Sequence, residues 1–547
     1  MKRRQFLAAS ASTLAACQAS PDIAGGFIGA SFERGHLLRG GQPQRQPSKI
    51  QRTRVVIVGG GVAGLAAARA MRLRGRDDFA LLELEDSAGG NSRAGVVNGM
   101  ACPLGAHYLP VPDESGVGAS PVRDLLEELG LRQRVAGRWR YDERHLCHSP
   151  QERLYIDGQW QEGLLPMHGV DAQTLAEYQR FAQLVQSASK AEVFVIPVAN
   201  TGVALTNAAL DAITFDSWLN QQQLTSPYLR WYLDYCCRDD YGAGSGVVSA
   251  WAGLHYFASR HGFSSPGIQP LQEREAGREG GVLTWPQGNG WLTEKLAAPL
   301  GGRLHTGQVV TRIAANKHGV EVDALDVASG QMHRWLAQRC VVALPLLVAA
   351  RVIDNPPPAL QQAAASARYA PWLVANIHIH AALHDKPGAA PSWDNVLYGN
   401  NNPLKNPLSN PLTSEALGYV DASHQGFARV AGATVLTHYR AFGIQPSRRQ
   451  HLYDQPWAYW RDTIRSELSV AHPDLPAKTT RIDIMRYGHA MSVPVPGVRT
   501  SRALQALQSP QGLYPRLHFA HSDLSGYSVF EEAFTHGHRQ GSVAARN

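Results

Sequence analysis

Blocks of apolar and polar positions predict a chain of mixed strands and helices. An apolar, β-branched run over 55–58 ends in glycines and continues as an alanine-rich stretch over 65–71. This order predicts a strand, a tight turn and the start of a helix. A second apolar run over 79–83 predicts the next strand, so that the segment forms a βαβ unit.

Helical spacing dominates from about 120 to 280, as in 121–130, where an acidic patch precedes a glycine stop. A glycine-rich turn over 281–292 then leads into a predicted helix over 293–300. Short alternating strands are predicted next, over 309–313, 319–323 and 340–345.

The pattern is less regular after 346. Residues 373–380 read as a strand with alternating faces, and 387–411 are rich in proline, asparagine and glycine. We expect a long loop over 387–411, which is either a lid over a site or a variable surface connection. The whole order of elements favours the α/β class, or α+β overall.

The turn after the first strand fits a dinucleotide-binding motif. Gly59, Gly61 and Gly64 fill G-x-G-x-x-G, where glycines permit a tight turn, close approach of a pyrophosphate and close helix–strand packing. Free N–H groups at this helix start, which includes Ala63, would hold the phosphates. Glu83 follows Gly64 by 19 residues, where a carboxylate reaches ribose hydroxyls. The alternative is an ordinary βαβ unit with glycine turns.

A second glycine turn follows this strand. The run from Glu83 to Arg93 contains Gly89 and Gly90, and it resembles the continuation found in the flavin amine oxidase superfamily. Nicotinamide enzymes do not usually carry this turn, so the resemblance implies FAD as the cofactor. It further implies a Rossmann-like FAD-binding domain of discontinuous segments, interleaved with a mixed helical and β-sheet substrate domain.

Two later segments follow the order of the same family. By this resemblance, backbone groups of Val310, or of Val309 beside it, cover the adenine. Residues 516–526 resemble the family's Phe-Ala-Gly-Asp/Glu segment, although His521 replaces the glycine. The resemblance therefore implies that Asp523 binds the ribityl chain.

The last helix of the family directs its N-terminus at the O2 edge of the flavin. Glu531 and Glu532 occupy this helix start in the present chain, where negative charge suits the helix dipole. Glu532 is therefore included among the predicted cofactor-binding residues.

The chemistry would come from segments that the family brings to the flavin. Tyr487 would form one wall of an aromatic cage, and His107 or His489 would act as a base or orient water. A hydrogen-bonded structural role is the alternative for each histidine. Asp239 and Asp240 could bind a cationic substrate, or they cap a helix or form an ion pair.

Many family members place a lysine near flavin N5. Ala375 or Asn376 stands at the corresponding point of this chain. This departure favours a dehydrogenase with another electron acceptor over an oxidase that uses oxygen.

The composition argues against several other classes of protein. The 547 residues carry a net charge of +7, but the basic residues are scattered and form no aromatic-interleaved stripe, so we predict no nucleic-acid partner. Six cysteines are few for this length, and without Cys17 an odd number remains, which disfavours a disulfide scaffold. Metal-ligand spacing is absent from the sequence, and no metal is predicted.

The N-terminus suggests export. Residues 2–7 resemble a twin-arginine signal, and 14–17 resemble a bacterial lipobox that ends at Cys17. These resemblances imply export in the folded state, acylation of Cys17 and a place at the periplasmic face of the membrane. A retained leader and cleavage without lipidation are the alternatives. The stretch 18–53 is rich in Gly, Pro, Gln and Arg and is predicted to be a flexible tether.

These observations predict an FAD-dependent oxidoreductase that oxidises an amine or polyamine by hydride transfer to flavin N5. Its partners would be a small-molecule amine, an electron acceptor (oxygen, a quinone or a redox protein) and a membrane surface reached through the lipid anchor. The alternatives are a desaturase-like flavoenzyme with an apolar substrate, and a non-redox flavoprotein with an isomerase or binding role. The predicted segments are a signal (1–17), the tether (18–53), the FAD-binding domain (54–115, 281–345 and 481–547) and the substrate domain (116–280 and 346–480).

Overall fold

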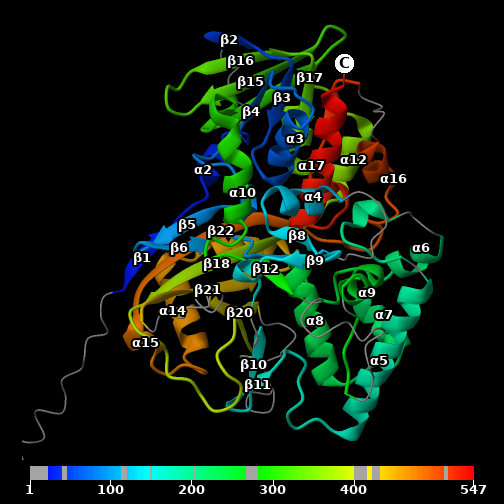
Figure 1. Cartoon of the computed structure of the whole chain (residues 1–547), viewed down its shortest axis with the longest axis vertical. Helices are drawn as coiled ribbons and strands as arrows, with labels where there is room; N and C mark the ends of the chain where they lie inside the picture. Colours follow the sequence, from blue (N-terminus) through cyan, green and yellow to red (C-terminus); the bar gives the residue numbers. More distant parts are fainter. Residues whose placement is uncertain are drawn as a thin grey trace, which may run out of the picture.

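The structure is a computed structural model in which two lobes are built around separate sheets (Figure 1). Cys17 and the predicted export signal lie outside the described residues. Among the residues that the structure does describe, no helix is long and apolar enough to cross a membrane. The described residues are 23–39, 46–112, 120–147, 151–191, 193–201, 205–260, 262–266, 281–399, 415–421, 432–509 and 515–546.

A parallel sheet of five strands forms the centre of the first lobe, in the order β13-β4-β3-β17-β23. Every residue of β3 and β4 is buried, as expected for parallel strands that are covered on both faces. The predicted βαβ unit is confirmed by β3, α3 and β4. The bounds are β3 (Val55–Val58), α3 (Val62–Arg72), β4 (Phe79–Leu82), β13 (Leu304–His305), β17 (Arg339–Val342) and β23 (Leu517–Phe519).

The last helix, α17 (Phe530–Ala544), packs directly against α3 (Figure 1). A Cβ atom on Gly537 would lie 2.0 Å from the carbonyl oxygen of Ala63, and one on Gly541 would lie 2.4 Å from that of Ala67. The two backbones therefore touch, and larger residues at these glycines would separate the helices. This contact fixes Gly537, in the middle of α17, beside the start of α3.

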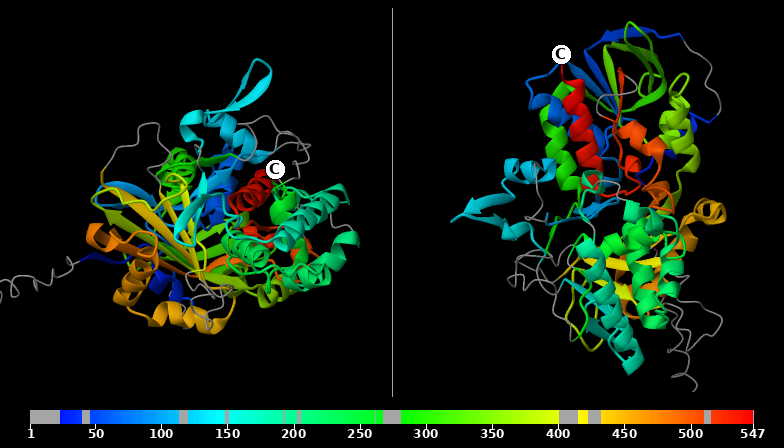
Figure 2. Two further views of the ribbon diagram at one scale, coloured as in Figure 1. Left: turned by 90° about the horizontal axis from the view of Figure 1, so that it is seen from below. Right: turned by 90° about the vertical axis from the view of Figure 1, so that its right-hand side faces the viewer.

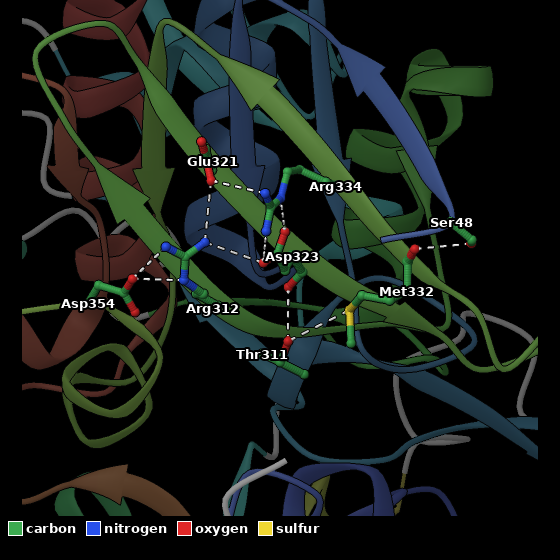
Figure 3. A network of polar contacts seen from close by, with 8 residues as sticks. All are labelled: Ser48, Thr311, Arg312, Glu321, Asp323, Met332, Arg334 and Asp354. Carbon is green, nitrogen blue, oxygen red and sulfur yellow. Dashed lines mark hydrogen bonds and ion pairs between the residues drawn. The ribbon is translucent and has the colours of Figure 1, made fainter. Parts of the chain in front are cut away.

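A four-stranded sheet flanks the first lobe, in the order β14-β15-β16-β2. Its outer face carries a lattice of ion pairs in which Arg312 and Arg334 both contact Glu321 and Asp323 (Figure 3). Arg312 also pairs with Asp354 at 2.7 Å. The strands are β14 (Gln308–Ala315), β15 (Val320–Asp326), β16 (Met332–Ala337) and β2 (Lys49–Arg52).

The second lobe is built on an eight-stranded sheet in the order β1-β22-β18-β21-β20-β19-β10-β11 (Figures 1 and 2). The central strand β18 is buried throughout because helices cover both faces. One face packs on α13–α15 and the other on α5 and α7–α9. The strands are β1 (Ala24–Phe27), β22 (Thr479–Ser492), β18 (Tyr369–Ile379), β21 (Thr434–Ala441), β20 (Ala416–Asp421), β19 (Asp394–Leu397), β10 (Glu152–Ile156) and β11 (Gln159–Glu162). The helices are α5 (Ala172–Ala191), α7 (Phe215–Gln221), α8 (Pro227–Tyr241), α9 (Ala250–Ala258), α13 (Pro446–Asp454), α14 (Trp457–Leu468) and α15 (Leu475–Lys478).

Helix α8 brings two acidic residues to the junction of the lobes. It begins with Pro227 in its first turn and ends at Gly242, whose φ of 75° lies in the left-handed region that glycine tolerates best. Asp239 and Asp240 therefore lie in the last turn, where the helix dipole disfavours negative charge. Their position works against helix stability and suggests another role.

The prediction of a flexible tether over 18–53 is wrong for the part that the structure describes. Strand β1 pairs with β22, and β2 pairs with β16. Between them lies α2 (Phe32–His36), and the preceding Ser31 N–H donates to Glu85 Oε1 at 2.9 Å. Strands of four residues carry too short a pattern to recognise, and their partners are sheet edges far away in the sequence.

Several predicted segment limits also differ from the structure. Strand β22 belongs to the eight-stranded sheet, although 481–547 was predicted to be FAD-binding. Conversely, α4 (Pro121–Glu128), α11 (Leu346–Val352) and α12 (Pro358–Ser366) pack into the cores of the first lobe. The predicted loop 387–411 contains β19, while 400–411 lie outside the described residues. Apolar spacing predicts that a face is buried, but it does not identify the core that buries it.

Candidate active site

The three motif glycines have three distinct surroundings. Gly59 has a φ of 100°, and a Cβ there would lie 2.3 Å from the Ala343 carbonyl oxygen. A Cβ on Gly64 would lie 1.8 Å from the Gly59 oxygen. Around Gly61 the nearest such contact is at 3.9 Å, and no side chain caps α3 there. Gly59 and Gly64 thus serve the turn and the packing, and Gly61 leaves room for a ligand at the helix N-terminus.

Glu83 lies at the end of β4 beside this turn. Its Oε2 accepts a hydrogen bond from Gly60 N at 2.7 Å, and its Oε1 accepts one from Glu85 N at 2.8 Å. Burial raises the pKa of Glu83, while the two backbone donors and Arg93 act in the opposite direction. Each oxygen keeps the capacity for another hydrogen bond, which suits the hydroxyls of a ribose.

The second glycine turn lies directly against the first. Gly89 N donates to Gly60 O at 2.8 Å, and both Gly89 and Gly90 have positive φ values. Arg93 contacts Glu85 at 3.6 Å and donates to the carbonyl oxygen of Gly29 at 3.0 Å. The N-terminal segment therefore holds Arg93 in place beside this turn.

Val310 lies in β14, after the edge strand β13 of the five-stranded sheet, and Asp523 follows the opposite edge strand, β23. Val310 follows Gln308, whose N–H donates to Glu83 O at 2.8 Å, so the strand β14 starts beside the ribose position. Asp523 accepts hydrogen bonds from Leu346 N at 3.0 Å and from the Tyr369 hydroxyl. Burial opposes its charge, but His521 and these donors hold the pKa of Asp523 below its usual value.

The side chain of Glu532 is held by the protein, and a cofactor contact at this helix start stays a prediction. Its buried carboxylate accepts hydrogen bonds from Val198 N, from Ala199 N at 3.3 Å and from Ser525 Oγ at 2.7 Å. These hydrogen bonds hold the segment at Val198 and Ala199 against α17. The neighbouring Glu531 instead lines a cavity that α8 also borders.

A cavity of about 150 Å³ lies between the glycine turns and α8. The aromatic residues that line it are His107, Tyr108, Trp372, Tyr439 and Tyr487. The acidic residues that line it are Asp239, Asp240 and Glu531. Among the described residues that line it, Arg260 is the one arginine, and lysine does not occur.

Two tyrosines fix the backbone beside this cavity. The Tyr487 hydroxyl donates to Leu104 O at 2.9 Å, and the Tyr439 hydroxyl donates to Gly105 O at 3.1 Å. The His107 ring lies 4.8 Å from the Tyr439 ring between centroids. Burial lowers the pKa of His107 to about 3, so this imidazole is neutral and weakly basic at neutral pH. Tyr487 and His107 are thus brought together as walls of one cavity.

His489 is not among the residues that line the cavity. Its ring packs edge-on against Tyr369, with 5.7 Å between the ring centroids. Burial and nearby arginines lower its pKa to about 4. The structure therefore separates His489 from His107 and Tyr487, although it lies only two residues after Tyr487.

The acids that line the cavity have unequal partners. Asp240 pairs with Arg260 at 2.8 Å. Burial and the charge of Asp240 raise the pKa of Asp239 to about 7, and burial raises that of Glu531 to about 7. The sequence indicates both aspartates as candidates, but it does not predict that Glu531 and Arg260 line the same cavity. Glu531 carried the signal of a helix start beside the flavin, whereas Arg260 carried none.

Side chains alternate between the two faces of β18, which contains the position where the family often has lysine. Trp372 and Val374 face the cavity, so Ala375 faces the opposite helices. Asn376 is fully buried, and its amide donates to Pro103 O at 2.9 Å while it accepts from the Thr437 hydroxyl. Neither position supplies a proton-carrying group to the cavity.

Gly61, the uncapped start of α3 and the carboxylate of Glu83 form a cradle that fits the adenosine diphosphate half of FAD. A family model for flavin-containing amine oxidoreductases matches residues 62–542. The chain belongs to this family, and it is an FAD-dependent oxidoreductase with a small-molecule substrate and an electron acceptor. Both the fold class and the cofactor predicted from the sequence are confirmed.

Among curated proteins, the chain is similar to an L-amino acid dehydrogenase of Synechocystis sp. (strain ATCC 27184 / PCC 6803 / Kazusa), with 26% identity over 320 residues. That match covers 56% of this chain and spans 59% of the relative's length. Among solved structures, putrescine oxidase bound to putrescine has a TM-score of 0.62 at 16% identity, with 90% of this chain and 99% of that chain covered. Cyclohexylamine oxidase from Brevibacterium oxydans IH-35A has a TM-score of 0.62 at 17% identity, with 90% and 98% covered. At these identities, the structural likeness establishes the fold alone.

Proposed function

We propose that this enzyme oxidises a cationic amine, either a simple amine or a polyamine. The observation that supports this most strongly is the charge of the cavity, where Asp239, Asp240 and Glu531 face a single arginine, Arg260. When bound, FAD supplies the hydride acceptor, and the cavity supplies binding and orientation.

The excess of acid is costly without a ligand of opposite charge. Burying an unpaired carboxylate costs several kcal/mol or forces it to take up a proton. Asp239 and Asp240 also oppose the dipole of α8. An ammonium group in the cavity would remove both penalties, whereas an apolar substrate would leave them in place. These penalties disfavour an apolar substrate and therefore the desaturase-like alternative.

The aromatic wall supports the same substrate class. Tyr439, Tyr487 and Trp372 present rings to the cavity, and aromatic rings attract cations that have lost their water. The wall also accommodates the carbon chain of an amine. Acids for the ammonium group and rings for the carbon chain would together orient the substrate.

A second candidate is an α-amino acid, which the name of the Synechocystis relative suggests. The specific observation is Arg260, which faces the cavity and could pair with a carboxylate. Its existing ion pair with Asp240 competes with this role. Amino acids therefore belong in the same substrate panel as amines.

We also propose that electrons leave the flavin to an acceptor other than oxygen, because the described cavity lining contains no lysine. The test is anaerobic mixing of the holoenzyme with a monoamine, a diamine, a basic and a neutral amino acid, and a fatty acid. Bleaching of the flavin absorbance by amines supports the function, and bleaching by none of the nitrogen compounds refutes it. Slow peroxide formation in air, together with fast reduction of a quinone, supports the dehydrogenase assignment.

For location, we propose export and acylation at Cys17, on the strength of the leader sequence alone. The check is cell fractionation of the full chain and of a Cys17→Ala variant. Recovery of the full chain in the membrane fraction, with release of the variant, supports the anchor. Recovery of both in the cytosol contradicts it.

A further inference from the structure

Two neighbouring glutamates begin α17 but differ in their surroundings. Glu531 is 6% exposed and lines the cavity. Within the described part of the chain, its carboxylate is hydrogen-bonded only by its own backbone N–H. Glu532 is fully buried and has three donors from the protein. A buried acid that faces a cavity without a protein partner indicates a partner in the ligand.

The charged groups around Glu531 leave it poised between its two protonation states. Arg260 favours the carboxylate, while Glu532 and Asp240 oppose it. Burial is the largest influence and raises the pKa of Glu531 to about 7. A general base is most effective when its pKa lies near the working pH.

Of the other titratable groups at the cavity, His107, Tyr487 and Asp240 are less suited to accept a proton, whereas the pKa of Asp239 is also raised to about 7. His107 has a pKa lowered to about 3 by burial, and the Tyr487 hydroxyl donates to a carbonyl with a pKa raised to about 12. Asp240 is already paired with Arg260. Asp239 lies on α8, where its nearest charges include Asp240, Glu152 and two arginines.

We propose that Glu531 is a catalytic residue that contacts the substrate ammonium group and accepts one of its N–H protons. One N–H bond breaks and one O–H bond forms, so the bound pair changes from ammonium and carboxylate to neutral amine and carboxylic acid. No electrons are transferred in this step. The neutral amine is the form from which hydride can leave the α-carbon. The inference rests on the proposed function, since it requires an amine substrate.

The first test compares Glu531→Gln and Glu531→Asp with the natural enzyme in anaerobic flavin reduction. We expect the natural rate to rise with pH through about 7, because the carboxylate form is the active one. In E531Q the rate should fall roughly 100-fold or more. The rise of the rate with pH, here called the pH limb, should disappear with it. E531D should keep the limb at a reduced rate. An E531Q enzyme with FAD bound that retains both rate and limb overturns the inference.

Glu532→Gln is the matched control, because burial also raises the pKa of Glu532 to about 7. Its carboxylate holds the segment at Val198 and Ala199, so the variant should lower the melting temperature. The pH limb of flavin reduction should remain. If E532Q loses the pH dependence and E531Q keeps it, the proton acceptor is Glu532. That result refutes the proposal.

A binding measurement gives a readout without turnover. The probe is tert-butylamine, which has no α-hydrogen to lose, titrated into the holoenzyme by calorimetry in two buffers of different ionisation enthalpy. About one proton should be released to the buffer below pH 7, where Glu531 is already protonated, and about none above it. In E531Q this break should disappear. Release that does not change with pH in the natural enzyme contradicts the proposal.

Flavin reduction by amines distinguishes a failure of the proposed function from a failure of the role of Glu531. If amines neither bind nor reduce the flavin, the proposed function fails. If amines reduce the flavin but E531Q behaves like the natural enzyme, only the role of Glu531 fails.

Discussion

Acidic residues gather in two regions of this molecule, on the outer face of the β14–β16 sheet and in the central cavity. Glu321 and Asp323 on the sheet, and Asp354 beside it, each lie 2.7–3.4 Å from a nitrogen of Arg312 or Arg334 (Figure 3). In the cavity, three acids share Arg260, and only Asp240 forms an ion pair with it.

The difference separates structural charge from functional charge. Paired charges at a surface contribute little each and hold the strands in register as a network. Charges that are buried without a partner destabilise the fold, so their presence indicates a ligand or a reaction that uses them. The following variants test this contrast, in order of decreasing effect.

Removal of an arginine should destabilise the cavity much more than the sheet. Arg260→Gln leaves Asp240 buried without its partner and should lower the free energy of unfolding by about 3 kcal/mol. Arg312→Gln removes a partly exposed arginine with several acidic neighbours and should cost about 1 kcal/mol or less. Denaturant unfolding of both variants measures the contrast, and equal losses would remove it.

The stability of the substrate-free enzyme should depend on pH in a characteristic way. The pKa values of Asp239 and Glu531 rise from 3.8 and 4.5, respectively, to about 7 in the folded state. Groups raised in this way stabilise the fold below their unfolded pKa, and this contribution is lost as pH rises through the folded pKa. The melting temperature should therefore fall between about pH 5 and about pH 8. In the double variant D239N/E531Q this fall should be smaller, and an identical profile contradicts the assignment.

Asp239→Asn should weaken amine binding without weakening the fold. The variant removes a carboxyl group whose pKa is raised to about 7 by burial and by Asp240. We expect KM for a diamine to increase roughly 10-fold to 100-fold with a smaller change in kcat, because uniform binding is lost. Steady-state kinetics and thermal unfolding check both parts. Unchanged KM would place the cation elsewhere.

The smallest effect is expected on the sheet. Asp354→Asn removes one exposed carboxylate from Arg312 and should change stability by less than about 1 kcal/mol. The effect should shrink further in high salt, and both FAD content and amine turnover should be unchanged. A clear loss of turnover would show that the lattice is coupled to the cavity.

Much of the cofactor site could be predicted from the sequence because it depends on local backbone geometry. Gly59, Gly61 and Gly64 have their separate roles within one turn, and Glu83 follows on the next strand. The substrate side could not be predicted in this way. Arg260 follows an ordinary helix, and only the packing of α9 against α8 brings it to Asp240.

Adjacent residues show the same limit most clearly. The sequence does not distinguish Glu531 from Glu532. The orientation of α17 places Glu531 at the cavity and Glu532 against Val198. Likewise, Tyr487 reaches the cavity while His489 does not. The N-terminal residues 23–39 read as a linker because sheet edges distant in sequence supply their partners.

The sequence by itself determined the strand–turn–helix unit, the glycine positions and the family, since these follow from steric rules that act over a few neighbouring residues. Only the tertiary structure decided which acids meet in the cavity, which of them has a basic partner and which histidine is excluded. The physical reason is that burial and charge pairing depend on contacts between segments far apart in the chain, and these contacts set the chemistry of each side chain.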